Sequence, residues 1–243
     1  MLIKKKRVRS HTEDRYLALV LATTAGILNA MALGAFGFFP SHMTGNASQI
    51  SSEISSSDMH SLLFLAVLIT AFVLGCTTAR FAVIAGLQRK IRTIFCLIIL
   101  VEGLALTAAS LFETVYYSPG YNGEILVLLG YLMGVHNSTS TQLSNGRVRS
   151  THITGTLTDA GIAFGSFVTS FISRSHSDER RFYQKQLHTH LTTIFSFLSG
   201  CIAGLLLFKS FGFYSMIGLG ILLTVVALSA IAITLQTARK RLY

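Results

Sequence analysis

Two short polar motifs in an otherwise apolar chain contain residue types that could bind a solute. Each motif reads His-x-Thr-Gly, at residues 42–45 and 152–155. A Thr-Gly step before an apolar run is typical of a helix N-terminus, with Thr44 or Thr154 as the capping residue. The backbone N–H groups exposed there favour an anionic or polar partner, and glycine permits a close backbone approach or an unusual φ. The sequence therefore predicts two helix tips that could bind a small polar or anionic solute.

Polar side chains inside or beside apolar runs are the other candidates. Glu102 lies near the middle of one run, where a carboxylate costs at least ~2.5–3.5 kcal/mol. We expect it to face the protein interior, either as a proton or cation site or as a neutral hydrogen-bonding acid. Asn29 and Asn137 either line a cavity or form interhelical hydrogen bonds. Asp159 either belongs to the site or complements a helix N-terminus. The predicted solute-binding or pore residues are Asn29, Thr44, Gly45, Asn46, Glu102, Asn137, Thr154, Gly155 and Asp159.

The sequence predicts no catalytic, metal or cofactor site. It contains no GxSxG motif and no phosphate-binding glycine loop. Cys76, Cys96 and Cys201 each lie alone in an apolar run, and no histidine spacing resembles a metal site. We therefore expect a protein that is not an enzyme and that binds no metal or cofactor. Intramembrane catalysis by Glu102, Asp159 and a histidine is a third alternative, after transport and a structural role.

The composition indicates that a membrane protein holds these residues in place. Of the 243 residues, 51% are hydrophobic and only 12% are charged, whereas a soluble domain carries about 25% charged residues. This excludes a soluble enzyme, a disordered protein and a secreted disulfide scaffold. A membrane-crossing helix needs about 20 apolar residues. The six runs that qualify are 16–39, 61–85, 93–112, 124–143, 191–208 and 212–236.

The basic residues set the predicted orientation. With six spans and the N-terminus inside, all but one of the 20 Lys and Arg residues lie on the cytoplasmic side, and only Lys209 lies outside. The segments 44–57 and 154–173 are too polar, or place too many basic residues outside, to count as spans. We predict a single multi-pass domain over 1–243 in the bacterial inner membrane. Both termini are cytoplasmic, residues 1–15 form a basic tail, and no nucleic acid is needed to explain the net charge of +10.

The two halves of the chain resemble each other. Residues 26–29 and 134–137 both read Gly-x-x-Asn, and the two His-x-Thr-Gly motifs follow at similar distances. The halves, 16–112 and 124–236, each contain three spans, and an odd number gives them opposite orientations in the membrane. Many secondary transporters and channels have this architecture. The predicted fold is all-α, with six transmembrane helices in two inverted three-helix repeats. Each repeat carries a Thr-Gly half-helix or re-entrant segment.

These motifs resemble the signature of the YoaK family. The similar residues are 42–46, 151–159 and the Gly-x-x-Asn at 134–137, and the likeness covers nearly the whole chain in length and helix order. The resemblance implies a small multi-pass bacterial membrane protein of unassigned function, from a group often described as small-metabolite transporters. Asn29 departs from the family pattern, which usually has Asp at that position.

Two functions are therefore expected. The first is a transporter or channel for a small polar or anionic solute, with its site near the midplane between the two Thr-Gly tips and the lipid bilayer around it. The alternative is a non-transporting scaffold or regulatory protein in which the Thr-Gly motifs only cap helices. Ladders of small residues, such as Gly200 and Gly204 or Gly161 and Gly165, predict close helix packing. That packing lies within the chain or between two copies, which leaves a homodimer open.

Overall fold

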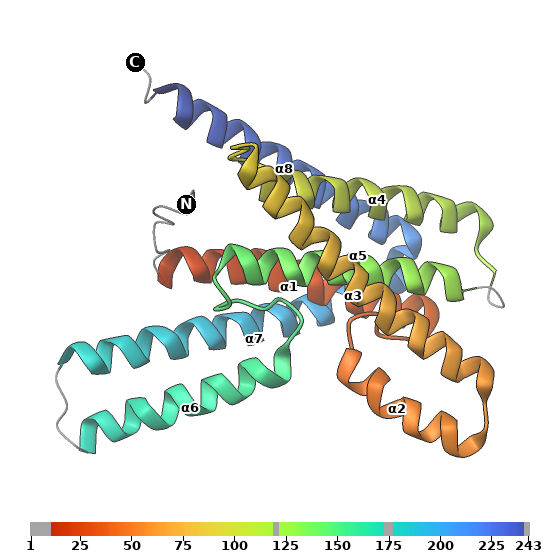
Figure 1. Cartoon of the computed structure of the whole chain (residues 1–243), viewed down its shortest axis with the longest axis horizontal. Coiled ribbons are helices and arrows are strands. Elements are labelled where there is room, and N and C mark those ends of the chain that lie inside the picture. Colours follow the sequence, from red (N-terminus) through yellow and green to blue (C-terminus); the bar gives the residue numbers. More distant parts are fainter. Residues whose placement is uncertain (1–10, 119–121, 173–176, 241–243) are drawn as a thin grey trace.

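A computed structural model describes residues 11–118, 122–172 and 177–240, and in this part of the chain it contains helices and no strands (Figure 1). Residues 1–10, which make up most of the predicted basic tail, lie outside the described residues. The all-α prediction is thus confirmed. The helices are α1 (His11–Phe36), α2 (Met43–Ser56), α3 (Met59–Gln88), α4 (Ile94–Tyr116), α5 (Gly123–Leu143), α6 (Ile153–Ile172), α7 (Ser177–Phe211) and α8 (Phe213–Lys240).

Several helices are long and apolar enough to cross a membrane, as the sequence predicted for a multi-pass membrane protein. In the described residues there are five such segments: Leu19–Phe36, Met59–Gln88, Ile94–Tyr116, Ser177–Phe211 and Phe213–Gln236. They correspond to five of the six predicted spans. The sixth predicted span is α5, which is not among these five because its last turns, 137–142, are polar. Its residues from Ile125 to Ser140 are nevertheless largely buried by the other helices.

A tight turn joins α2 to α3. Ser57 adopts a left-handed conformation (φ 58°) that ends α2. The Asp58 carboxylate then caps α3, accepting hydrogen bonds from the backbone N–H groups of His60 and Ser61 and from the Ser61 hydroxyl. These hydrogen bonds, the one from the Ser61 hydroxyl above all, lower the pKa of Asp58. The Asp58 cap therefore fixes the residue at which helix α3 starts.

Glycines bring helices of the two halves into direct backbone contact. Gly26 of α1 lies against the Phe197 carbonyl of α7, and Gly134 of α5 lies against the Phe72 carbonyl of α3. A Cβ atom at either glycine would overlap that carbonyl oxygen. Helix α1 therefore pairs with α7, and α5 pairs with α3, so that each half of the chain packs against the other half. Figure 1 shows α7 lying alongside α1 and α3 crossing α5.

A second pair of glycines makes a symmetric contact between α4 and α8. A Cβ atom at Gly103 would lie 2.8 Å from the Gly220 carbonyl oxygen, and Gly220 approaches Thr107 and the Gly103 carbonyl in return. Both glycines open a Gly-x-x-x-Thr sequence, ending at Thr107 and Thr224. The contacts are thus matched between the first four helices and the last four. In α6, by contrast, Gly161 and Gly165 have nothing within 4 Å, whereas the ladders of α1, α5 and α7 pack within the chain.

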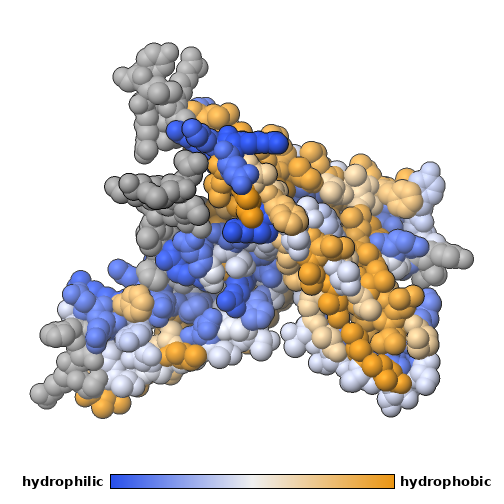
Figure 2. Space-filling view, viewed as in Figure 1, coloured by the Kyte–Doolittle hydropathy of each residue, from blue (hydrophilic) through white to orange (hydrophobic). Residues whose placement is uncertain are grey.

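The apolar core lies between α1, α4, α5 and α8. Its fully buried side chains include Leu28, Leu106, Leu129 and Leu223. Outside the core, large apolar residues are exposed along α3, α4 and α8. Figure 2 shows apolar residues over α3 and α4, whereas hydrophilic residues gather over α7 and the connection from α5 to α6. An apolar middle with hydrophilic residues gathered at one end suits a protein that crosses a bilayer.

Candidate functional site

The two His-x-Thr-Gly tips meet at one cavity. Helices α2 and α6 begin near the middle of the molecule and run toward opposite ends (Figure 1). A cavity of about 670 Å³ lies between their first turns. Helices α1, α3, α5 and α7 complete its walls with Asn29, Ala30, Leu33, Phe72, Asn137, Phe197, Cys201, Ile202 and Leu205. The cavity is thus built from both halves of the chain.

The prediction that Thr44 caps α2 is wrong. Helix α2 begins at Met43, and its cap position is occupied by His42, whose side chain forms no capping hydrogen bond. Helix α6 begins at Ile153, so Thr154 likewise lies inside the first turn. The helices start earlier because the His42 carbonyl accepts the N–H of residue 46, and the His152 carbonyl accepts that of residue 156. Both threonine side chains are exposed and line the cavity.

In each tip the histidine ring folds over the glycine three residues later. A Cβ atom at Gly45 would overlap the His42 imidazole, and one at Gly155 would overlap the His152 imidazole. Neither glycine has a positive φ among the described backbone. Glycine is therefore needed at these positions for close approach of the ring and not for an unusual backbone conformation. Both histidine rings take part in lining the cavity, a role that the motif itself could have indicated.

Asn29 and Asn137 both line the cavity, but their hydrogen bonds differ. The Asn29 side-chain oxygen accepts hydrogen bonds from the Ser41 N–H (3.2 Å) and the Ser41 hydroxyl (2.8 Å), which tie the first tip to α1. The Asn137 side-chain oxygen is buried and has no hydrogen-bond partner in the protein. Of the predicted site residues, the cavity thus brings together Asn29, Thr44, Asn137 and Thr154, with Gly45 and Gly155 directly beside them.

The other three predicted residues lie elsewhere. Asn46 is buried (4% exposed) and is not among the residues that line the cavity. Asp159 is exposed and lines a separate pocket of about 310 Å³ with Arg147, Tyr183 and His190. Glu102 lies in the core, away from both. Among the described residues, the cavity lining therefore contains no carboxylate, and its ionisable side chains are two histidines and Cys201.

Glu102 forms a buried pair with His136. Glu102 Oε1 lies 2.7 Å from His136 Nδ1, and both residues are 2% exposed. His136 Nε2 lies 2.9 Å from the Leu21 carbonyl oxygen, so the pair joins α4, α5 and α1. Sequence reasoning missed this pairing. A signal was available, because each of the two ionisable residues lies inside its own apolar run, Glu102 in 93–112 and His136 in 124–143.

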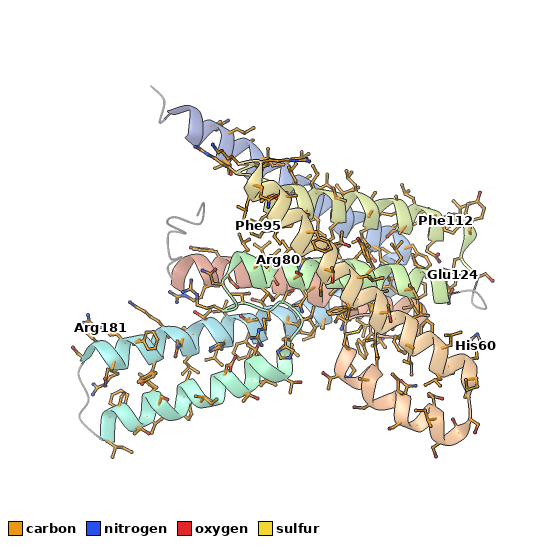
Figure 3. The ribbon with its side chains drawn as sticks, in the orientation of Figure 1. His60, Arg80, Phe95, Phe112, Glu124 and Arg181 are labelled. Carbon is orange, nitrogen blue, oxygen red and sulfur yellow. The ribbon has the colours of Figure 1, made fainter. Side chains whose placement is uncertain are left out.

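The polar run that ends α5 bonds mostly within the protein. Ser138 donates to the Cys76 carbonyl, and Ser140 contacts the Ser150 hydroxyl. Gln142 donates to Ser138 and accepts a hydrogen bond from Arg80 at 2.9 Å (Figure 3). Of this polar run, only Asn137 is among the described residues that line the cavity between the tips. The polar side chains of α5 therefore join helices as well as contribute to a site.

The architecture and the paired tips define a helical protein with several helices fit to span a membrane, built around a cavity between the first turns of α2 and α6. The chain belongs to the family described as "Protein of unknown function (DUF1275)", whose model matches residues 17–229. The resemblance to the YoaK family is compatible with this membership. No curated protein and no solved structure matches the chain.

Proposed function

We propose that this protein is a membrane transporter or channel for a small polar or anionic solute, which binds in the cavity between the two tips. The observation that carries the proposal is that one cavity is lined by both His-x-Thr-Gly motifs and by Asn29 and Asn137. Two helix N-termini and two histidines face it, and no carboxylate of the part of the chain that the structure describes lines it. Helix N-termini favour negative charge and hydrogen-bond acceptors, which supports an anionic or polar solute.

The proposed topology has six spans in two inverted repeats, with α5 as the sixth. A polar helix segment is tolerated at membrane depth where it is buried in protein or lines a cavity, and the C-terminal turns of α5 do both. The start of α1, the α3–α4 turn and the end of α8 lie toward one side of Figure 1, and the end of α4 and the start of α5 lie toward the other. In this topology α2 and α6 are re-entrant, the site is near the midplane, and both termini are cytoplasmic, with the surrounding bilayer being the bacterial inner membrane.

Cysteine accessibility tests the proposal. Cys76, Cys96 and Cys201 are replaced by Ala, and a single cysteine is placed at Thr44 or at Thr154. Intact cells and inverted vesicles are treated with a small hydrophilic thiol reagent or with a bulkier one. Both tips are expected to react with the small reagent and to be protected from the bulky one, because a narrow water-filled path leads to the cavity.

Matched control cysteines lie on the same helices outside the cavity. Ser55 and Thr169, near the far ends of α2 and α6, are exposed and do not line it, so cysteines there should react without regard to reagent size. Tips that are inert, or that react like these controls, would reject a restricted central site.

The alternative, a scaffold or regulatory protein, predicts a different pattern. It requires close packing but no water-filled path, so narrowing the cavity by Asn137→Trp should leave the labelling of Thr44 and Thr154 cysteines unchanged. Gly204→Leu overlaps the Ile27 backbone and should disrupt the fold of either kind of protein, so it serves as the control for misfolding. A transporter should instead fold with Asn137→Trp and lose access of the small reagent to both tips.

A further inference from the structure

The geometry of the buried pair fixes how many protons it holds. The Leu21 carbonyl can only accept, so His136 Nε2 carries a hydrogen and donates to it at 2.9 Å. A neutral imidazole then has a lone pair on Nδ1, facing a carboxylate oxygen 2.7 Å away. Two lone pairs repel at that distance, so one further proton lies between Nδ1 and Oε1. It is bound either as an imidazolium beside a carboxylate or as a carboxylic acid donating to a neutral imidazole.

Both of these forms have no net charge, whereas the form without the shared proton carries one negative charge. The site is buried, since both residues are 2% exposed, and the helices that hold them also form the apolar core of α1, α4, α5 and α8. The second Glu102 oxygen is buried and has no partner in the protein. An uncompensated charge in such surroundings costs several kcal/mol or more. The proton can therefore leave only if the pair separates and gains water or another counter-charge.

The matched position in the other half shows that packing alone does not require this pair. Aligning Gly26 with Gly134 places Leu28 opposite His136, and aligning Gly220 with Gly103 places Leu219 opposite Glu102. Leu28 and Leu219 are both buried in the apolar core. Two leucines thus occupy the place that the charged residues occupy in the other half. An ionisable pair in one of two matched sites points to a use that packing does not supply.

We propose that Glu102 and His136 form a proton-binding site whose loss of a proton moves α5 and changes access to the cavity, which would couple the proposed transport to protons. The proton that leaves goes to water, and the pair keeps a negative charge on Glu102. Repulsion then pushes His136 from Glu102, and the next residue of α5, Asn137, lines the cavity. Gly134 of α5 touches the backbone of α3, which also lines it through Phe72. This inference rests on the proposed function only for the final coupling to transport.

No other titratable group competes for the proton. Among the described residues, only Leu21 forms a further hydrogen bond with either member, and its carbonyl carries no charge. Leu106 and Met133, about one helical turn from Glu102 and His136, belong to the apolar core. The other charged residues of the described parts of α1, α3, α4 and α5 lie toward the helix ends and include Arg15, His60, Arg80, Glu113 and Glu124.

Infrared difference spectra test the proton site without a substrate. The purified full-length protein in lipid is compared between high and low pH. The difference spectrum should contain either the carbonyl band of a protonated carboxylic acid or the ring band of an imidazolium. That signal should disappear in the double variant E102L/H136L, which copies the leucine pair of the other half and is expected to fold. Glu113→Gln, which removes another buried acid of α4, should leave the signal in place. A spectrum of the double variant identical to that of the wild type would overturn the proton site.

Labelling of Cys201 tests the coupling to the cavity. With Cys76 and Cys96 replaced by Ala, Cys201 is the single thiol and lines the cavity. Its rate of reaction with a small hydrophilic reagent is measured against pH, with and without E102L/H136L. The ratio of the two rates removes the intrinsic pH dependence of the thiol and should change by about tenfold across the titration, a usual size for coupled sites. A constant ratio would overturn the coupling. Reaction of Cys201 at every pH would then still support a wet cavity, whereas an inert Cys201 would count against the proposed function itself.

Discussion

The two tips are built alike and are held differently. In both, the histidine carbonyl accepts the N–H four residues on, the imidazole covers the glycine, and the buried and exposed residues follow the same order. Yet Ser41 donates two hydrogen bonds to Asn29, whereas the side-chain oxygen of Asn137 has no protein partner. The first tip is thus fixed to α1. The second leaves an amide oxygen free to bond a solute or water, so the repeat preserves the shape of the cavity but not its polar contacts.

The largest expected effect tests whether the α1–α7 and α3–α5 helix contacts are equivalent. Gly26→Leu and Gly134→Leu each force a side chain into a backbone carbonyl of the facing helix, at Phe197 or Phe72. Overpacking costs about 1–3 kcal/mol where side chains can give way and more where only backbone can move. Both variants should lose the folded peak in detergent size-exclusion chromatography. Gly161→Leu, which meets open space, should keep the folded peak. Loss of the folded peak in only one of Gly26→Leu and Gly134→Leu would show that the two contacts are not equivalent.

A smaller loss of stability is expected at the core position where one half has the Glu102–His136 pair and the other has two leucines. His136→Leu leaves Glu102 buried without its partner, and removing one member of a buried pair typically costs about 3–5 kcal/mol. Thermal unfolding in detergent should show a marked loss of stability. Adding Glu102→Leu should restore most of it, since Leu28 and Leu219 fill the matched site. A double variant no more stable than His136→Leu would contradict the proposed match between the halves.

Replacing the two cavity asparagines should change stability by a smaller amount, and by different amounts in the two tips. Asn29→Ala removes the acceptor of two hydrogen bonds from Ser41, each worth about 1 kcal/mol. Asn137→Ala removes an oxygen that bonds nothing in the protein, so its thermal midpoint should change little. The difference between the two thermal midpoints measures how much more the Asn29 hydrogen bonds stabilise the first tip. Equal losses would mean that Asn137 also holds its tip in place.

The smallest effect concerns the glycines of the motifs. Gly45→Ala and Gly155→Ala push against an imidazole ring that can swing away, so stability should fall by roughly 1 kcal/mol or less. The displaced ring lines the cavity, so labelling of Cys201 should change in both variants. Adding His42→Ala to Gly45→Ala should return the labelling rate toward that of His42→Ala alone. Independent effects of the two substitutions would show that the ring does not respond to the glycine.

Much of the fold could be predicted from the sequence because apolar length and the repeated motifs are local signals. Five predicted spans correspond to helices fit to cross a membrane, and the predicted starts of α2 and α6 lie within two residues of the observed ones. The α1–α7 and α3–α5 pairing was not predicted, because neighbours in sequence are the usual neighbours in space. A signal for it was present and missed: residues 72–76 and 197–201 both read Phe-x-x-Gly-Cys.

The site was predicted less completely than the fold. The motifs indicated the two tips, and the structure brings Asn29, Asn137, Thr44 and Thr154 to one cavity. The helix starts were predicted too late in the chain. The backbone carbonyls of His42 and His152 accept the first helical hydrogen bonds, and a backbone carbonyl is present whatever the residue type. Glu102 was placed with the tips because a buried acid suggests a ligand site. Its partner is a long-range contact that spacing cannot reveal.

The exchange of partners between halves also bears on how the protein is made. Helix α1 leaves the ribosome well before α7, yet the glycine contacts that hold α1 are with α7. Contacts between residues far apart in sequence form slowly, and helices that wait for them expose surface meant for packing. The first half must therefore remain in the membrane without its proper neighbour until the second half arrives. Two halves expressed as separate chains should be degraded alone and rescued together.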